Sequence, residues 1–161
     1  MKITNEEILK GLINIFKINR QRIEVYCKLS ETVYTPELQQ HFKTQVDEST
    51  SLLNELNPIL YQSLENPENP VLYEDSEIDQ SVFYFGMARA SNNIRTVMIS
   101  CQFGDEFLIK TYQRVLGFLE VNHVSALNDV LSDHLKSIGH TDFNMENMFS
   151  CNLTMKYFKL Q

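Results

Sequence analysis

Two acidic residues, Asp105 and Glu106, lie inside the stretch SCQFGDEFLIKTYQRVL (100–116), whose apolar spacing is that of an amphipathic helix. Carboxylates inside a helical bundle are the usual ligands of a paired metal centre. Such a centre needs a Glu from each of two helices and a Glu-x-x-His pair from each of two others, all facing inward. We expect none of the four histidines to belong to a Glu-x-x-His pair, so the set of ligands would be incomplete.

The helical period indicates which of the two acids faces the interior. Successive residues of a helix are rotated by about 100°, and an apolar stripe marks the buried face. Asp105 falls near the centre of the stripe, whereas Glu106 falls to one side and is expected at the rim or on the surface. The stripe is formed by Ile94, Cys101, Leu108, Tyr112, Val115 and Leu119.

Other polar residues fall on the inward stripes of the remaining helices. A buried Asp needs a partner, and Arg22 is the obvious one for Asp105. We therefore predict either a satisfied polar layer that fixes the register of the helices or a possible ligand site at the same place. Its predicted members are Asn19, Arg22, Tyr26, Gln45, Ser49, Asp105 and Tyr112, with His134 at the edge of the apolar face.

Periodicity and capping residues predict long helices around these positions. We expect them over residues 5–32, 36–56, 93–119 and 123–138, with Asn122 capping the last one and a short helix at 81–90. The proline-rich segment 57–80 reads as a long connection, and 143–161 as an apolar tail. The prediction is one all-α domain over 1–161, a four-helix bundle with a long crossover between its second and third helices.

Composition and charge exclude several classes of function. The net charge of −7 and the lack of a basic cluster argue against nucleic-acid binding. No apolar run is long enough for a membrane span. Three widely spaced cysteines suggest neither a zinc site nor disulfides, so we expect a cytoplasmic protein.

Two motifs resemble a bacterial ferritin-like family of unknown function (domain of unknown function 2383). The first helix of that family carries I-N-x-D-R-x-E-G-Y. Ile18, Asn19, Arg22, Glu24 and Tyr26 match it, while Gln21 and Val25 depart from it. The family's third helix carries C-x-x-G-E-D and a later tyrosine, which Cys101, Gly104, Asp105 and Tyr112 match. The resemblance covers about residues 8–135 and implies a ferritin-like bundle but no particular chemistry.

Three functions are compatible with these observations. The favoured one is a non-catalytic binding or stress-associated protein without cofactor, which associates as a homodimer or with a protein partner through its apolar tail. The second is a degenerate di-metal protein using Glu24, Glu48, Asp105, Glu106 and His134, which requires both Glu24 and Glu48 inside. The third is a small-ligand-binding bundle with a pocket beside Asp105, lined also by Tyr26, Cys101 and Tyr112.

Overall fold

The computed structural model describes residues 1–33, 36–64 and 76–150, and for Ser76 and residues 139–150 it describes the backbone only. The described part contains five helices and no β-strand. The prediction of an all-α chain is therefore confirmed. The helices are α1 (Glu6–Thr32), α2 (Pro36–Ser63), α3 (Ser76–Ala90), α4 (Ile94–Val121) and α5 (Ser125–Ser150).

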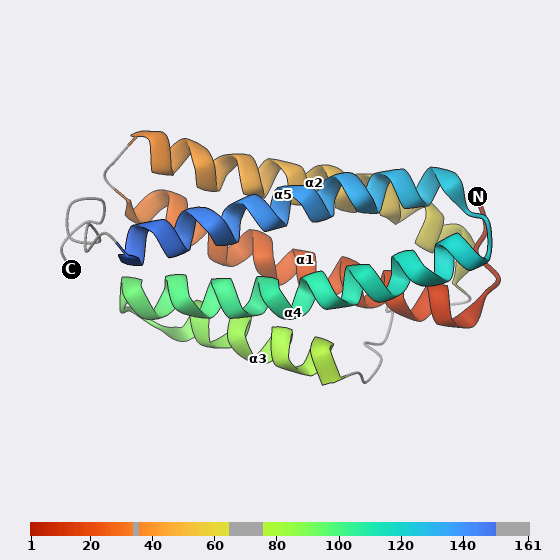
Figure 1. The fold of residues 1–161 in the computed structure, drawn as a ribbon, viewed down its shortest axis with the longest axis horizontal. Helices are drawn as coiled ribbons and strands as arrows, with labels where there is room; N and C mark the ends of the chain where they lie inside the picture. Colours follow the sequence, from red (N-terminus) through yellow and green to blue (C-terminus); the bar gives the residue numbers. More distant parts are fainter. Residues whose placement is uncertain (34–35, 65–75, 151–161) are drawn as a thin grey trace.

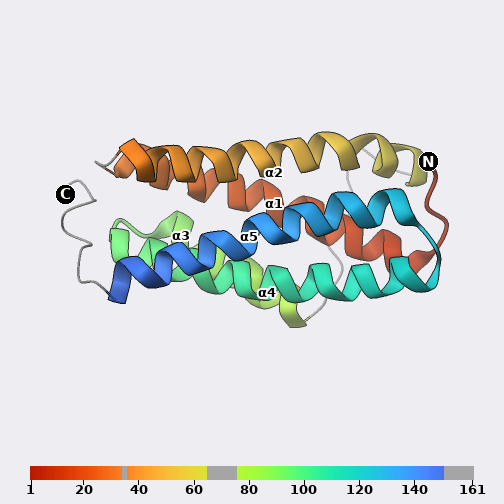
Figure 2. The same ribbon diagram turned by 45° about the horizontal axis from the view of Figure 1, so that its top comes forward.

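Four of these helices are long and lie side by side as a bundle, with α1 against α2 and α4, and α5 against α4 and α2 (Figures 1 and 2). The shorter α3 packs on the outside, against α4 and α1. In Figure 1, α2 and α4 run in the same direction, and α3 leads the chain back to the end where α4 begins. None of the described helices has both the length and the apolar content to cross a membrane.

Polar side chains close the exposed ends of the helices. The Asn5 side chain accepts a hydrogen bond from the Ile8 N–H at 3.1 Å and caps α1, and Asn93 caps α4 in the same way. The carboxyl end of α3 is held from another helix, because the Lys28 ammonium donates to the carbonyls of Ala88, Arg89 and Ser91. A cation at this end also interacts favourably with the helix dipole.

The second helix is longer than predicted. It does not end near Leu56 but continues through Pro58 to Ser63, so residues 57–63 are not part of a connection. Leu56 and Leu60 are both buried and extend the apolar stripe by another turn. This burial offsets the cost of a proline inside a helix, which is about 3 kcal/mol. The helix predicted at 81–90 likewise begins earlier, at Ser76.

The link between the last two helices also differs from the prediction. Asn122 does not cap the following helix; it closes α4, where its side chain donates to the Phe118 carbonyl at 2.8 Å. His123 has a positive φ of 57°, and α5 begins only at Ser125. Gly139 does not end α5, which continues to Ser150, so part of the predicted tail is helical. The remainder, 151–161, lies outside the described residues.

Two glycines let neighbouring helices approach closely. A Cβ atom built on Gly104 of α4 would lie 2.9 Å from the Phe85 ring of α3, and one built on Gly11 of α1 would collide with the Val115 side chain of α4. Phe85 and Val115 are buried. These contacts fix the distances between α3, α4 and α1, and so set the position of the polar residues between them.

Candidate functional site: a buried polar layer and an acidic groove

An ion pair between α1 and α4 forms the centre of the polar layer. Arg22 Nε donates to Asp105 Oδ1 at 2.8 Å, and Nη2 donates to Oδ2 at 3.2 Å. Neither side chain has any exposed surface. The two-point geometry is the strong form of this interaction, because both guanidinium and carboxylate are planar.

The remaining hydrogen-bonding capacity of this pair is used by α1 and α2. Tyr26 donates its hydroxyl proton to Asp105 Oδ2 at 2.6 Å, while its ring lies 4.4 Å from the centre of the Arg22 guanidinium. On α2, Gln45 Oε1 accepts from Arg22 Nη2 at 2.9 Å, and Ser49 Oγ accepts from Nη1 at 2.8 Å. Positive and negative charge are therefore balanced and surrounded by polar partners.

A second chain of hydrogen bonds links the pair to α5. Asn19 Nδ2 donates to the Ile15 carbonyl and, at 2.9 Å, to the Tyr112 hydroxyl. The Tyr112 hydroxyl lies 2.6 Å from His134 Nδ1, and His134 Nε2 lies 3.3 Å from Ser49 Oγ. Asn19 donates to Tyr112 and Arg22 donates to Ser49, so each hydroxyl keeps a proton of its own, and the neutral His134 ring accepts one of the two and donates to the other oxygen.

Burial keeps the uncharged members of the layer uncharged. It lowers the pKa of His134 to about 3, and the nearby charge of Arg22 acts in the same direction. Burial and the charge of Asp105 raise the pKa of Tyr26 well above 10, and burial also raises the pKa of Tyr112. Burial alone would lower the pKa of Arg22, but Asp105, Tyr26 and Tyr112 together outweigh this effect and raise it. The layer therefore contains one cation and one anion throughout the neutral pH range.

This arrangement is suited to holding helices in register. Every predicted member of the layer is buried: Asn19, Arg22, Tyr26, Gln45, Ser49, Asp105, Tyr112 and His134. Both carboxylate oxygens of Asp105 already accept hydrogen bonds from protein donors. Because the Asp105 carboxylate has no exposed surface, a substrate in solution cannot contact it.

The structure does not bring the five residues of the di-metal hypothesis together. Glu24 lies on the surface, where it pairs with Arg89 at 3.5 Å, and Glu48 is also exposed. Glu106 is half-buried beside the layer. No group of three His, Cys, Asp or Glu side chains that could hold a metal ion occurs among the described residues.

One Glu-x-x-His spacing does occur in the chain, at Glu120 and His123, so the expectation of none is wrong. Both residues are exposed, and they lie where α4 ends and the turn to α5 begins. Fifteen residues of helix, about 22 Å, separate Glu120 from Asp105. The pair therefore does not contribute to the interior.

The four residues predicted to line a pocket beside Asp105 lie in the interior, away from the groove described next. Tyr26, Cys101, Asp105 and Tyr112 have no exposed surface, and none of them lines the open space of the molecule described next. Burial also raises the pKa of the Cys101 thiol well above 9.

An open groove of about 530 Å³ runs between α2 and α5. Its lining residues are Asp47, Glu48, Ser51, Leu52 and Glu55 of α2 with Asp129, Val130, Asp133, His134 and Ser137 of α5. Five of them are acidic and none is Lys or Arg. His134 belongs both to this groove and to the polar layer, so it connects the two.

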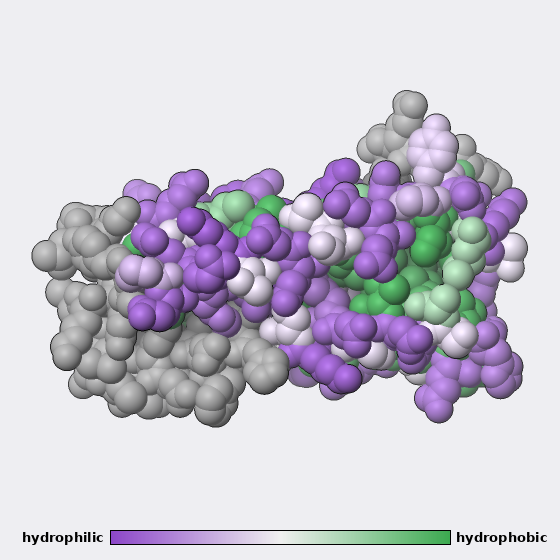
Figure 3. All heavy atoms as spheres, turned by 90° about the horizontal axis from the view of Figure 1, so that it is seen from above, coloured by the Kyte–Doolittle hydropathy of each residue, from purple (hydrophilic) through white to green (hydrophobic). Residues whose placement is uncertain are grey.

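The floor of the groove continues into a smaller apolar hollow of about 90 Å³, which shares Glu55 and Val130 with it. Leu56, Ile59, Ala126 and Leu127 line this extension. Figure 3 looks onto this face and shows an apolar hollow with hydrophilic residues on both sides. Sequence reasoning missed the groove because acids at helical spacing read as an ordinary solvated face. One feature of the sequence could have indicated the groove: in both acidic stretches, 47–55 and 129–133, an apolar residue lies among the acids.

A comparison of this chain with models of protein families, with curated proteins and with solved structures finds no match. The resemblance to the ferritin-like family stays a prediction.

Proposed function

We propose that this chain is a non-catalytic binding protein built on a ferritin-like bundle of α1, α2, α4 and α5. In this proposal α3 and the segment before it form the long crossover. The parallel course of α2 and α4 supports that topology, because the chain must return along the bundle between them (Figure 1).

The observation that carries the proposal is the contrast between the two polar regions of the molecule. The Arg22–Asp105 pair has no exposed surface and is hydrogen-bonded to protein groups on every side, whereas the groove between α2 and α5 is open. A groove of about 530 Å³ is in the size range of ligand sites. The groove, and not the polar layer, is therefore the binding site in this proposal.

The lining of the groove specifies the chemistry of its partner. Leu52 and Val130, continued by Leu56 and Ile59, offer an apolar floor, and five carboxylates surround it. From Asp47 to Ile59 the floor follows α2 for about 18 Å, which is a little over three helical turns. A basic amphipathic helix from a protein partner fits this surface, with its apolar face on the floor and its Lys or Arg side chains at the acidic rim.

The test uses a labelled 18-residue helical peptide with Leu on one face and Lys on the other. Fluorescence anisotropy measures its binding to the full chain at physiological salt. A matched peptide with Glu at every Lys position is the control for charge. We expect saturable micromolar binding of the basic peptide and none of the acidic one.

Variants separate groove binding from general attraction to an acidic protein. The double variant Asp129→Asn/Asp133→Asn removes two carboxylates from the groove and is expected to weaken binding about tenfold. Glu7→Gln/Glu120→Gln removes the same charge from exposed positions outside the groove and should have little effect. Equal loss in both variants would contradict the proposal. Binding of spermidine at the groove without binding of the peptide would reassign it to small organic cations.

A further inference from the structure

The apolar hollow at one end of the groove differs from the groove in the residues that line it. Five carboxylates line the groove, whereas Glu55 is the only charged side chain among the described residues that line the hollow. Because Glu55 and Val130 line both spaces, a molecule that lies in the groove borders the hollow directly. The apolar lining residues are Met1, Leu56, Ile59, Ala126, Leu127 and Val130.

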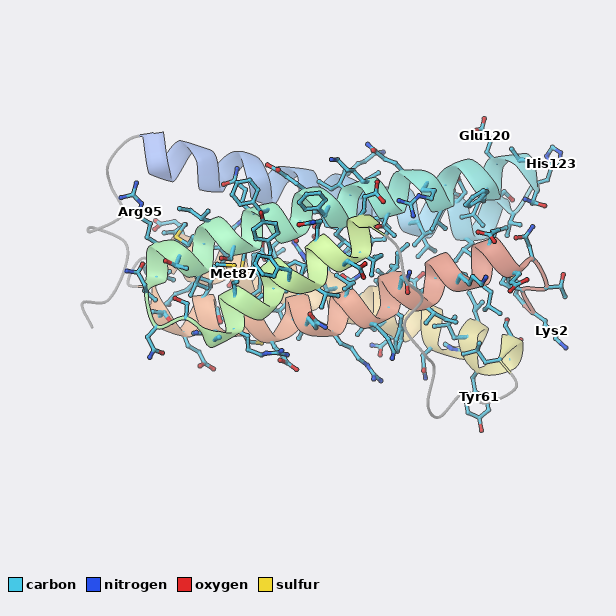
Figure 4. The ribbon with its side chains drawn as sticks, turned by 90° about the horizontal axis from the view of Figure 1, so that it is seen from below. Lys2, Tyr61, Met87, Arg95, Glu120 and His123 are labelled. Carbon is cyan, nitrogen blue, oxygen red and sulfur yellow. The ribbon has the colours of Figure 1, made fainter. Side chains whose placement is uncertain are left out.

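Three separate parts of the chain form the hollow. Ile59 lies near the end of α2 and Ala126 in the first turn of α5, while Met1 comes from the segment that precedes α1. These parts meet at the end of the bundle where Figure 4 labels Lys2 and Tyr61. The hollow therefore depends on the tertiary structure and not on the face of one helix.

Two hydrogen bonds keep the segment before α1 beside α2. Ile3 is buried, and its N–H donates to Ser63 Oγ at 2.8 Å. The Ser63 hydroxyl donates in turn to the Ile59 carbonyl at 2.6 Å. Met1 lies two residues before Ile3 and lines the hollow, although 52% of its surface is exposed. A methionine side chain is unbranched and flexible, so it adapts to the shape of an apolar group that enters.

The size of the hollow limits what it holds. Its volume is about 90 Å³, against about 530 Å³ for the groove. An apolar cavity of about 150 Å³ is large enough for a benzene molecule. The hollow is therefore too small for a helix and fits one aliphatic side chain. A helix that binds in a groove gains much of its affinity from a few such side chains.

We propose that the hollow holds one large aliphatic side chain of the partner helix, Leu or Met, which we call the anchor. This inference rests on the proposed function, because the partner must lie in the groove for its anchor to enter the hollow. Leu56 and Ile59 are four and seven residues beyond Leu52 of the groove floor, which is about 6 to 10 Å along α2. The anchor therefore lies at one end of the partner's apolar face.

The acid at the boundary of the hollow indicates which residue neighbours the anchor. Glu55 is exposed and lines both the hollow and the groove. A Lys or Arg one helical turn from the anchor places its charge near this carboxylate, whereas an acid there would be repelled. The expected pattern in the partner is a terminal Leu or Met with a basic residue one turn away.

The first test is an alanine scan of the labelled basic peptide described above. Each Leu is replaced in turn by Ala, which preserves the helix, and fluorescence anisotropy measures each Kd for the full chain. We expect one Leu near an end of the peptide to dominate, with a loss of at least about tenfold in affinity when it is replaced. Equal losses at every Leu would overturn the anchor and leave groove binding standing. No binding by any peptide would overturn both proposals.

The second test fills the hollow from the protein side. Ala126→Leu adds a larger side chain at an exposed lining position and keeps a strong helix former. It should bring the Kd values of the original peptide and of the peptide lacking the anchor within about twofold of each other, because the anchor no longer has room. Ala90→Leu, at the exposed end of α3, is the matched control and should keep the tenfold difference. If Ala126→Leu also kept it, the hollow would not be the anchor site.

The third test locates the anchor directly. Photo-leucine, a diazirine analogue close to Leu in size, replaces the Leu that dominates the scan, and ultraviolet light links it covalently to what it touches. Mass spectrometry should find the links on Met1, Ile59 or Leu127. The same analogue at a Leu from the middle of the peptide should label Leu52 or Val130 of the groove floor. Links from the anchor position that fall only outside the hollow would contradict the proposal.

Discussion

The guanidinium of Arg22 and the carboxylate of Asp105 form a two-point ion pair with no exposed surface on either side chain, although 83 positions separate them in the chain. The pair joins α1 to α4, and Gln45 and Ser49 attach it to α2. A shift of α1 or α4 by one turn would separate the two charges, and a shift of α2 would take two acceptors away from the guanidinium. The layer therefore selects one register among the ways in which four apolar stripes could pack.

Breaking this pair from either side is expected to be strongly destabilising. Arg22→Met leaves the Asp105 carboxylate buried beside apolar atoms, and Asp105→Leu leaves the guanidinium without its counter-charge. Each single variant should lower the free energy of unfolding by about 3–5 kcal/mol, measured by urea denaturation. The double variant should lose far less than the sum, because no uncompensated charge remains.

A neighbouring acid provides the control for this cycle. Glu106→Gln changes the charge at the next residue, which is half-buried and outside the layer, and should alter stability by less than about 1 kcal/mol. Additive losses in the double variant would show that the pair is not coupled and would contradict the register argument.

Acidification should destabilise the fold through His134. The pKa of this histidine is about 3 in the folded chain and 6.5 when unperturbed, so the unfolded state binds the additional proton first as pH falls. The contribution of His134 to the free energy of unfolding is therefore fully present above pH 6.5. It is lost as the pH falls from 6.5 toward 3, at up to about 1.4 kcal/mol per pH unit.

The control for this prediction is His134→Gln, whose amide can accept from one of the two hydroxyls, Tyr112 or Ser49, and donate to the other but does not titrate. Urea denaturation of both proteins between pH 7 and pH 4 separates the histidine from the carboxylates, which titrate in both. The difference in free energy of unfolding between the unmodified chain and the variant should become smaller as the pH falls. A difference that stays constant would mean that His134 is not held neutral by its surroundings.

Sequence periodicity is informative about the direction of a side chain and much less so about the ends of helices. Because each residue rotates by about 100°, the apolar stripe places Asp105 and Arg22 toward the interior, and the structure has them there as partners. The end of α2 beyond Pro58 and the turn at Asn122 depend on long-range packing, which local residue preferences do not contain. The groove and its apolar hollow depend on how far apart helices lie, and no single helix carries that information.

The cysteines should differ sharply in reactivity. Cys101 is fully buried, and burial raises the pKa of its thiol well above 9, whereas Cys27 is only half-buried. In a Cys151→Ser background, a thiol reagent such as Ellman's reagent should modify Cys27 in the folded protein. Cys101 should react more than about a thousandfold more slowly, at the rate of unfolding. The variant Cys27→Ser/Cys151→Ser isolates Cys101, and rapid labelling of that variant would contradict the burial of Cys101.

Two glycines in helices should respond to alanine in opposite ways. Alanine normally stabilises a helix interior by about 1 kcal/mol relative to glycine, and Gly117 is exposed with no neighbour within 4 Å of a Cβ atom. Gly117→Ala should therefore raise the midpoint of urea denaturation. At Gly11 the new methyl group collides with Val115, a buried β-branched residue that cannot turn away easily. Overpacking of this kind costs about 1–3 kcal/mol, so Gly11→Ala should lower the midpoint or leave it unchanged. If Gly11→Ala stabilised the protein as much as Gly117→Ala, α1 and α4 could not lie as close as the ion pair between Arg22 and Asp105 requires.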